Sequence, residues 1–379
     1  MKRGLENGPG SAMTDSADNA NFSALLDAVE SRKRTLLAYL TQERFLRRFQ
    51  PAHIRDAVFS YVRGGGKSLR PAVAMLACGA LGGDESRALP VAAAIEIYHT
   101  WTLVHDDVID RDDTRRGLPT VHRDFARRAA EEFGWAPDAA EHYGRTIAML
   151  AGDVQQSWSW SLLFEAHLEF GVPAEIVLRL GQDLASRVTP LLVEGETLDV
   201  QYSGAVLALD ESAIIDMLWK KTGVLYEFAG RAGAAIALNN ADAGLPAARA
   251  IARFCSLCGA AFQIQDDILG IVGDERQLGK PVGSDIREGK TTLLTLKALE
   301  RADSQQRELI LRTLGAENAS HDDAQAVTEL LRQLGAVRYA QERSRQTVEE
   351  ALGHLGALPP SANRDLLEQW ARYLIQRQF

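Results

Sequence analysis

Apolar residues recur along most of the chain at spacings of three and four positions, as from Leu25 to Val29 and again from Ile214 to Leu218. This is the period of an α-helix with one buried face, and no sustained alternation of the kind that a β-strand needs interrupts it. Alanine-rich windows such as 91–97 favour helices that pack closely. The pattern therefore predicts an all-α fold.

Glycine and proline clusters divide this pattern into helical segments joined by short turns. The breaks fall at 64–66, 82–83, 117–119, 171–173, 279–283 and 358–360. Because the connections are short and no internal repeat is evident, one helical bundle over residues 22–379 fits better than two domains joined by a linker. Residues 1–21 are rich in Gly, Ser, Asn and Asp. This composition predicts a disordered leader, either native or added during cloning.

Composition narrows the classes of function. With 379 residues and 46% hydrophobic content, the chain can bury a large core. Its 51 acidic residues outnumber 42 basic ones, which argues against general binding to nucleic acids or anionic membranes. Three cysteines give neither a disulfide framework nor a complete set of zinc ligands. No apolar run approaches the ~20 residues of a membrane span, and no signal-peptide core begins the chain. We therefore expect a cytoplasmic protein without a transmembrane segment.

The segment 103–110 places three aspartates, Asp106, Asp107 and Asp110, among apolar residues. Residues four apart lie one turn above each other on a helix, so Asp106 and Asp110 would share one face. Carboxylates placed in this way repel each other unless a cation lies between them. The segment fits a divalent-metal site, although a solvated acidic helix face explains it equally well when it is taken alone.

Two arginines, Arg115 and Arg116, follow this first acidic segment at a predicted turn. Arginine offers paired donors for phosphate oxygens, and Mg²⁺ is commonly held by a few carboxylates together with substrate phosphates. Carboxylates and arginines together therefore indicate a diphosphate site. The alternative is a network of surface salt bridges between these arginines and the neighbouring aspartates.

A second group of candidate anion ligands lies upstream. Lys67 and Arg70 follow three glycines at a predicted helix start, where exposed N–H groups and close backbone approach favour an anion. His99 lies about two helical turns before the first acidic segment and could donate to the same anion, although a buried structural histidine is the more ordinary interpretation. The spacing required of a nucleotide-binding P-loop is absent.

A second acidic segment, Asp266 and Asp267, follows Gln263 far along the chain. The glycine-rich stretch after it carries Lys280 and Lys290, at a loop and at a predicted helix start. Both positions suit an anionic ligand. The sequence thus offers two acidic segments, each accompanied by cations.

Taken together, these segments resemble the trans-prenyl diphosphate synthases, or polyprenyl synthetases, and most closely the short-chain geranylgeranyl diphosphate synthases. The match runs from about Val62 to Thr292. The resemblance implies an all-α, single-domain isoprenoid-synthase-type helical bundle around a deep central cavity, usually a homodimer. It also implies head-to-tail (1'-4) condensation of isopentenyl diphosphate with an allylic prenyl diphosphate through an Mg²⁺-assisted allylic carbocation.

The resemblance assigns roles to individual residues. It implies that Asp106 and Asp110 hold two Mg²⁺ ions and that Asp266 holds a third. The implied catalytic residues are Asp106, Asp107, Asp110, Arg115, Lys221, Asp266 and Asp267. The implied ligands of the allylic diphosphate are Arg115, Lys221, Thr222, Gln263, Lys280 and Lys290, and those of isopentenyl diphosphate are Lys67, Arg70, His99 and Arg116. Lys221 lies in a helical stretch where a lysine commonly extends to water, so alone it would mean little.

The chain departs from the family pattern at Gly270, where many members carry the last aspartate of a second D-D-x-x-D motif. We expect activity to survive, because the resemblance assigns that metal mainly to the first aspartate. The affinity for the metal ion assigned to Asp266 is the property in doubt.

Product length depends on the helix that carries the first acidic segment. Helical periodicity places Tyr98, Trp101 and Thr102 below the diphosphate site, where they would form the floor of the prenyl cavity. An aromatic residue five before the motif and a non-aromatic residue four before it resemble the archaeal-type geranylgeranyl synthases. The resemblance therefore implies a C20 product, with C15 farnesyl diphosphate as the alternative. Ordinary core packing is the alternative role for Tyr98 and Trp101.

Two other classes of protein share parts of this pattern. A class I terpene cyclase also ionises a prenyl diphosphate, but its second metal motif requires a Ser or Thr where this chain has Gly270. A cyclase also needs only one diphosphate site, whereas the cations here supply two. A non-catalytic subunit of a heteromeric synthase would keep the fold, but it would not need both acidic segments.

Overall fold

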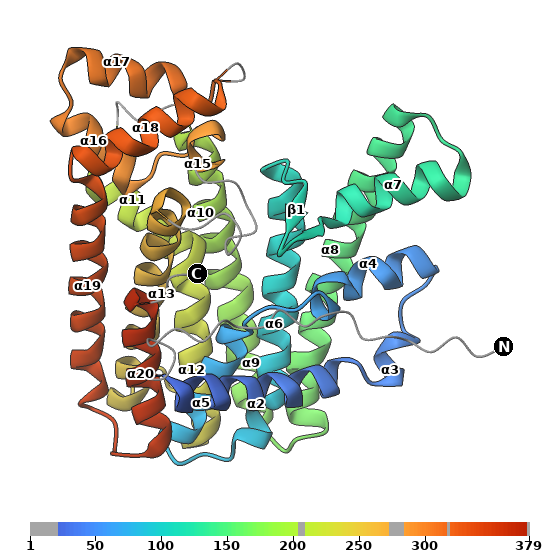
Figure 1. The fold of residues 1–379 in the computed structure, drawn as a ribbon. Coiled ribbons are helices and arrows are strands. Elements are labelled where there is room, and N and C mark those ends of the chain that lie inside the picture. Colours follow the sequence, from blue (N-terminus) through green and yellow to red (C-terminus); the bar gives the residue numbers. More distant parts are fainter. Residues whose placement is uncertain (1–21, 204–208, 273–283, 317–318, 377–379) are drawn as a thin grey trace.

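A computed structural model describes residues 22–203, 209–272, 284–316 and 319–376 and confirms the all-α fold (Figure 1). The predicted leader at 1–21, the break at 279–283 and Lys280 lie outside the described residues. The first helices are α2 (Ser23–Leu40), α3 (Glu43–Leu46), α4 (Ala52–Arg63), α5 (Leu69–Ala80), α6 (Glu85–Ile109), α7 (Val121–Phe133), α8 (Pro137–Leu168), α9 (Ala174–Asp183) and α10 (Thr189–Tyr202). They are followed by α11 (Glu211–Leu218), α12 (Val224–Leu238), α13 (Pro246–Val272), α15 (Ser284–Arg287), α16 (Leu293–Arg301), α17 (Ser304–Thr313), α18 (His321–Gln333), α19 (Ala336–Leu355) and α20 (Ala362–Gln376).

Three local features were not predicted. Two π-helical turns interrupt the α-helical repeat: Leu184–Val188 directly precedes α10, and Trp219–Gly223 directly follows α11. A two-stranded antiparallel hairpin, β1 (Thr114–Arg115) and β2 (Leu118–Pro119), follows the first acidic segment. The hairpin is closed by a two-residue loop in which Arg116 and Gly117 both have positive φ, the geometry that matches the twist of adjacent strands.

Five of the six predicted breaks fall in the described residues, and each separates helices or begins at the end of one. The glycines at 64–66 follow α4, and those at 82–83 separate α5 from α6. The remaining breaks at 117–119, 171–173 and 358–360 coincide with the hairpin and with the connections after α8 and α19. Glycine and proline therefore mark the ends of these helices well.

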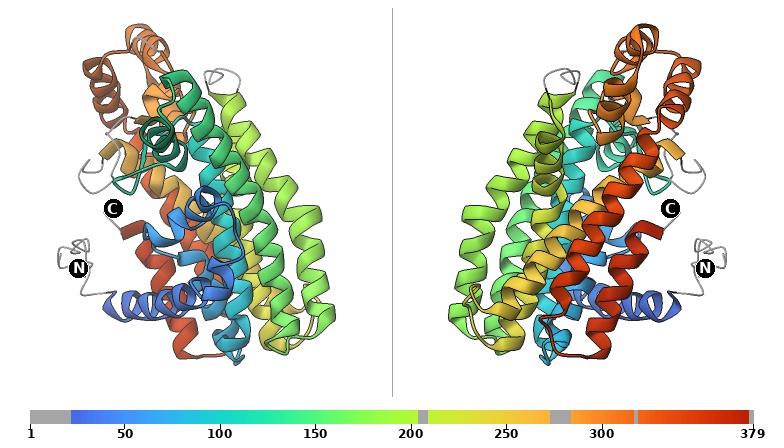
Figure 2. Two further views of the ribbon diagram at one scale, coloured as in Figure 1. Left: turned by 90° about the vertical axis from the view of Figure 1, so that its right-hand side faces the viewer. Right: turned by 90° about the vertical axis from the view of Figure 1, so that its left-hand side faces the viewer.

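The long helices α6, α8, α12, α13 and α19 run side by side through the molecule (Figures 1 and 2). Helix α2 lies across one end of this bundle, and α15 to α18 cover the other (Figure 1). Two apolar clusters fill the interior, and α13 belongs to both: Phe254 packs in the larger and Ile268 in the smaller. A shared helix is consistent with one domain, which stays a prediction. None of the described helices combines the length and apolarity needed to cross a membrane.

Helices α5 and α12 approach closely because Gly233 of α12 has no side chain. A Cβ at this position would overlap the carbonyl oxygen of Ala74 and lie 2.8 Å from the Cβ of Ala77. Both contacts belong to helix α5, so neither can yield without moving a helix. Small residues therefore fix the spacing of the helices that frame the bundle.

We predict that Gly233→Ala lowers the free energy of unfolding by about 1–3 kcal/mol, because overpacking forces the two helices apart. The matched control is Gly353→Ala on α19, where nothing lies within 4 Å of an added Cβ. There alanine should be neutral or stabilise by up to ~1 kcal/mol through helix propensity. Thermal unfolding followed by circular dichroism checks both variants, and similar melting temperatures for the two would contradict the packing argument.

Candidate active site

A cavity of about 710 Å³ opens between α6, α10, α13 and the hairpin. Most of the predicted site residues line it. These are Arg70, His99, Trp101, Thr102, Asp106, Asp110, Arg115, Arg116, Lys221, Thr222, Gln263, Asp266, Asp267 and Lys290. Residues far apart in sequence therefore meet at one cavity, as the two acidic segments led us to expect.

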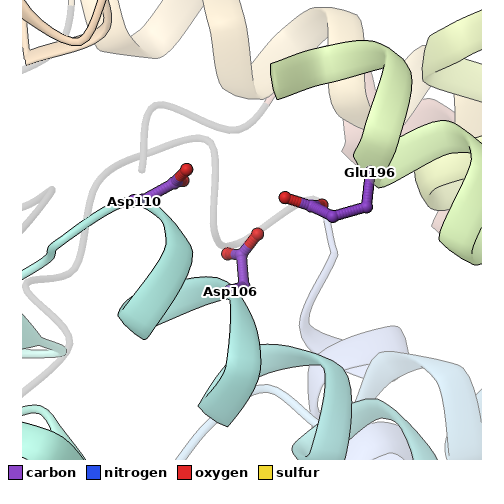
Figure 3. A group of neighbouring side chains, drawn as sticks. All are labelled: Asp106, Asp110 and Glu196. Carbon is purple, nitrogen blue, oxygen red and sulfur yellow. The ribbon is translucent and has the colours of Figure 1, made fainter. Parts of the chain in front are cut away.

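Three carboxylates converge on one side of this cavity (Figure 3). Asp106 and Asp110 come from the end of α6, and Glu196 faces them from α10. Each offers an oxygen, and these oxygens lie within 4.8 Å of one another. Sequence reasoning missed Glu196, although the segment Gly195-Glu196-Thr197-Leu198-Asp199 does place two carboxylates three positions apart on one helical face.

A close contact between α10 and the π-helical turn Trp219–Gly223 brings Lys221 to these carboxylates. A Cβ on Gly195 would overlap the Lys221 backbone nitrogen, so glycine allows the two segments to touch. The Lys221 Nζ lies 2.5 Å from Asp199 Oδ2, 3.0 Å from Glu196 Oε2 and 3.5 Å from Asp106 Oδ1. Lys221 therefore serves the site rather than extending to water.

Lys290 forms a similar ion pair with Asp110, the last carboxylate of the first acidic segment. Its Nζ lies 2.7 Å from Asp110 Oδ2 and 3.0 Å from Glu288 Oε2. Its backbone N–H donates to the carbonyl oxygen of Asp285 at 2.9 Å, which holds Lys290 at the cavity. The two lysines thus offset the repulsion between carboxylates that the sequence predicted.

Burial opposes ionisation of these carboxylates, and the nearby lysines counter it only in part. Burial raises the pKa of Glu196 to about 7, with Lys221 acting in the opposite direction and Asp106 adding to the rise. Burial also raises the pKa of Asp110, against the effect of Lys290. The carboxylates therefore hold their charge less readily than exposed ones and would gain from a further cation.

Asp107 lies behind the cavity surface and is fully buried. Its Oδ1 accepts a hydrogen bond from Arg115 Nε at 2.7 Å, and its Oδ2 accepts one from the Tyr61 hydroxyl. A second nitrogen of Arg115, Nη2, lies 3.4 Å from Asp106 Oδ2. Asp107 and the hairpin therefore orient Arg115 toward the cavity, while Asp107 itself does not line it.

The opposite side of the cavity is formed by α13, which carries Gln263, Asp266 and Asp267. Gln263 Oε1 accepts from Thr222 Oγ1 at 2.8 Å, and Gln263 Nε2 donates to Asp267 Oδ1 at 3.1 Å. This chain of hydrogen bonds links the second acidic segment to the π-helical turn that carries Lys221. Thr222 and Gln263, both predicted to bind the allylic diphosphate, are thus hydrogen-bonded to each other.

The second group of cations surrounds another part of the cavity. Arg70 Nη1 lies 2.9 Å from His99 Nε2, and its guanidinium carbon lies 4.5 Å from the centre of the Tyr226 ring. Because arginine only donates, His99 Nε2 accepts and the ring proton lies on Nδ1. Burial, together with Arg70, keeps the pKa of His99 well below its usual range. His99 is therefore neutral and orients Arg70.

Arg116 joins this group through the glycines at the end of α4. A Cβ on Gly66 would lie 2.5 Å from Arg116 Nη1, so the guanidinium packs against glycine backbone. Lys67, the next residue, is exposed on the same loop and does not line the cavity. Three of the four predicted ligands of a second anion therefore line the cavity, and Lys67 does not.

Trp101 and Thr102 line the cavity on the α6 side, toward the helix N-terminus from the first acidic segment. The Trp101 Nε1 donates to His105 Nδ1 at 3.2 Å, and His105 Nε2 lies 3.2 Å from the carbonyl oxygen of Met149 on α8. Tyr98 is buried behind Trp101, with 4.9 Å between ring centres. Trp101 is thus held from two sides.

The donor set fits a hard divalent cation, which prefers carboxylate oxygens. Two of these oxygens, Glu196 Oε1 and Asp267 Oδ2, are buried without a hydrogen-bond partner among the described residues. A buried carboxylate oxygen without a partner is costly, and a bound cation would remove that cost. Both sides of the cavity therefore suit metal ligation.

Comparison with known proteins agrees with this geometry. The family model of the polyprenyl synthetases matches residues 51–331. A geranylgeranyl diphosphate synthase from Sulfolobus acidocaldarius is 33% identical over 85% of this chain and 88% of its own length. A geranylfarnesyl diphosphate synthase from Aeropyrum pernix is 34% identical over 86% of this chain and 95% of its own.

Solved structures give the same result. The crystal structure of a geranylgeranyl pyrophosphate synthase from Corynebacterium glutamicum, complexed with isoprenyl diphosphate and magnesium, superposes with a TM-score of 0.81. It is 28% identical, and the match covers 94% of this chain and 99% of the other. With both acidic segments and their cations facing one cavity, this chain belongs to the polyprenyl synthetase family and is a prenyltransferase, a trans-prenyl diphosphate synthase.

Proposed function

We propose that this synthase condenses isopentenyl diphosphate head-to-tail with an allylic prenyl diphosphate and releases geranylgeranyl diphosphate. The observation that carries the proposal is the presence of two cation groups at one cavity. One surrounds the carboxylates and contains Lys221 and Lys290, and the other contains Arg70 and Arg116. A condensation of two diphosphates needs two such groups, whereas a cyclase needs one.

Three Mg²⁺ ions complete the proposed site. Asp106 and Asp110 would hold two of them, with Glu196 facing the same space, and Asp266 would hold the third. Bound Mg²⁺ supplies charge neutralisation that makes the allylic diphosphate a good leaving group. With Asp106, Asp110 and Glu196 engaged by metal, Lys221 would keep Asp199 and Lys290 would keep Glu288 as partners, and both lysines could face the diphosphate oxygens.

The residues of the chain then perform three tasks. Arg115, Lys221 and Lys290 hold the allylic diphosphate where its charge grows as the C–O bond breaks. Arg70 and Arg116 hold isopentenyl diphosphate with its double bond toward the allylic carbon. Carbon–carbon bond formation is followed by loss of a proton to the departing diphosphate. Apolar lining residues exclude water from the allylic cation.

The proposed C20 length rests on Trp101. Its ring lines the cavity and is braced by Tyr98 and His105, so it forms a rigid floor for the growing prenyl chain. Similarity to the geranylgeranyl synthases supports this length. Farnesyl diphosphate, one isoprene unit shorter, is the alternative product.

We also propose a homodimer, in the cytoplasm. Its support is a set of exposed apolar side chains on α8 and α9, which suit a protein interface better than water. They are Met149, Leu150, Phe164, Leu168 and Leu178.

Incubation of the purified protein with Mg²⁺, isopentenyl diphosphate and one allylic primer at a time tests the condensation. Chromatographic sizing of the dephosphorylated products should show elongation to C20, and a metal chelator should abolish it. Asp110→Ala should lower kcat by about 10²-fold or more. The control is Asp113→Ala, whose exposed carboxylate pairs with Arg123. Absence of elongation with every primer would refute the proposal, and release of a hydrocarbon would favour a cyclase.

Mg²⁺ should stabilise the protein more at pH 8 than at pH 6. The raised pKa of Glu196, about 7, leaves this carboxyl protonated below neutrality, and a metal requires the ionised form. The gain in melting temperature on adding Mg²⁺ should therefore grow as pH rises through about 7. Glu196→Gln should reduce both the gain and its pH dependence, whereas Glu194→Gln, on the exposed side of α10, should not. Equal behaviour of the two variants would remove Glu196 from the metal site.

Trp101→Ala should lengthen the product by at least one isoprene unit, because it removes the floor that stops the prenyl tail. Product sizing by chromatography provides the measurement. Trp135→Ala is the control, since this tryptophan is exposed after α7. An unchanged product from Trp101→Ala would show that the floor lies elsewhere.

A further inference from the structure

The guanidinium group of Arg70 is held by few hydrogen bonds. Arg70 is the second residue of α5, and its side chain lines the cavity. Its Nη1 donates to His99 Nε2 at 2.9 Å, whereas its Nε is buried without a hydrogen-bond partner among the described residues. A single hydrogen bond does not fix a planar group that carries five N–H donors, so another contact must set its position.

Tyr226, on α12, supplies that contact. The guanidinium carbon of Arg70 lies 4.5 Å from the centre of the Tyr226 ring. A cation over an aromatic ring is attracted by the negative charge of the ring face, and the attraction is strongest where water is excluded. Tyr226 is fully buried and is not among the residues that line the cavity. The ring therefore holds Arg70 without occupying the space that is open to a ligand.

The Tyr226 ring is itself fixed by two further helices. Phe262 of α13 lies 5.9 Å away between ring centres, and Trp370 of α20 lies 5.3 Å away. Helix α13 can come this close because Gly259 has no side chain, since a Cβ there would lie 2.9 Å from Tyr226 Cδ2. A buried ring packed in this way has little freedom to move. Tyr226 is therefore a rigid support for Arg70.

We propose that Tyr226 is a positioning residue for the second substrate, because its ring fixes the Arg70 guanidinium where that group binds the diphosphate of isopentenyl diphosphate. The inference rests on the condensation proposed above, in which Arg70 and Arg116 hold this substrate. His99 orients one nitrogen of Arg70, and the ring supports the cation as a whole. Tyr226 acts only through Arg70. Loss of the ring should therefore weaken binding of isopentenyl diphosphate and leave the allylic substrate unaffected.

Steady-state kinetics of two variants at position 226 test this role. Tyr226→Leu removes the ring and keeps an apolar side chain. At saturating allylic primer, its KM for isopentenyl diphosphate should rise about fivefold to thirtyfold, the range expected for loss of a desolvated cation–π contact. Its KM for the allylic primer should stay close to the wild-type value. Tyr226→Phe keeps the ring and should retain the wild-type KM for both substrates.

A double-mutant cycle separates support of Arg70 from general damage to the core. In the Arg70→Ala background, Tyr226→Leu should cause no further rise in the KM for isopentenyl diphosphate, because no guanidinium remains for the ring to hold. Phe254→Leu is the matched control, since it removes another buried ring that packs on Trp370, with 5.8 Å between ring centres. It should lower the melting temperature, as Tyr226→Leu does, but leave both KM values unchanged.

Calorimetric titration of the full chain with isopentenyl diphosphate repeats the comparison without turnover. Unchanged binding in Tyr226→Leu would overturn the proposal, and so would an equal rise in both KM values or a full effect that persists in the Arg70→Ala background. Failure of the wild type to bind isopentenyl diphosphate would overturn this proposal and the condensation together. Binding that depends on Tyr226 but leads to no elongation would support this proposal and overturn the condensation alone.

Discussion

Repulsion between carboxylates brought together around one cavity is the constraint on which the rest of the site depends. Asp106, Asp110 and Glu196 converge within a partly buried space, where each charge raises the free energy of the others. In this structure Lys221 and Lys290 offset the repulsion. Metal ions could replace Lys221 and Lys290 as partners of these carboxylates, and the lysines could then pair with diphosphate. The net charge of the site would change little, which suits a site that must accept metal and diphosphate together.

The fold meets this constraint through small residues and long helices. Gly195 allows α10 to touch the turn that carries Lys221, and Gly66 lets the Arg116 guanidinium pack against the backbone. Long helices such as α6 and α13 then hold their acidic segments rigidly on opposite sides of the cavity. Precision at the site follows from packing outside it, because each charged group lies on an element fixed by buried apolar contacts.

The sequence predicted the helices and most of the cavity, because both depend on short-range periodicity and on residue types grouped in motifs. Five predicted breaks agree with the described helix ends, and fourteen predicted site residues line the cavity. The contribution of Glu196 was missed because it depends on α10 facing the end of α6 across the cavity, which the spacing of Glu196 and Asp199 alone does not reveal. The place of Tyr226 beside Arg70 was hidden for a similar reason, since it depends on packing between α12 and α5.

The π-helical turn Trp219–Gly223 lies within one continuous helical run from α11 to α12. Such a turn accommodates one residue more than the α-helical repeat, and each residue of an α-helix turns the chain by about 100°. The residues of α12 are therefore rotated about the helix axis relative to their positions in an uninterrupted α-helix that continued from α11. Deleting one residue here would restore an ordinary α-helical turn and keep the faces of α11 and α12 in phase, but it would remove the wide turn that brings Lys221 and Thr222 to the cavity. The chain can therefore lose a residue in a surface loop far more easily than at this turn.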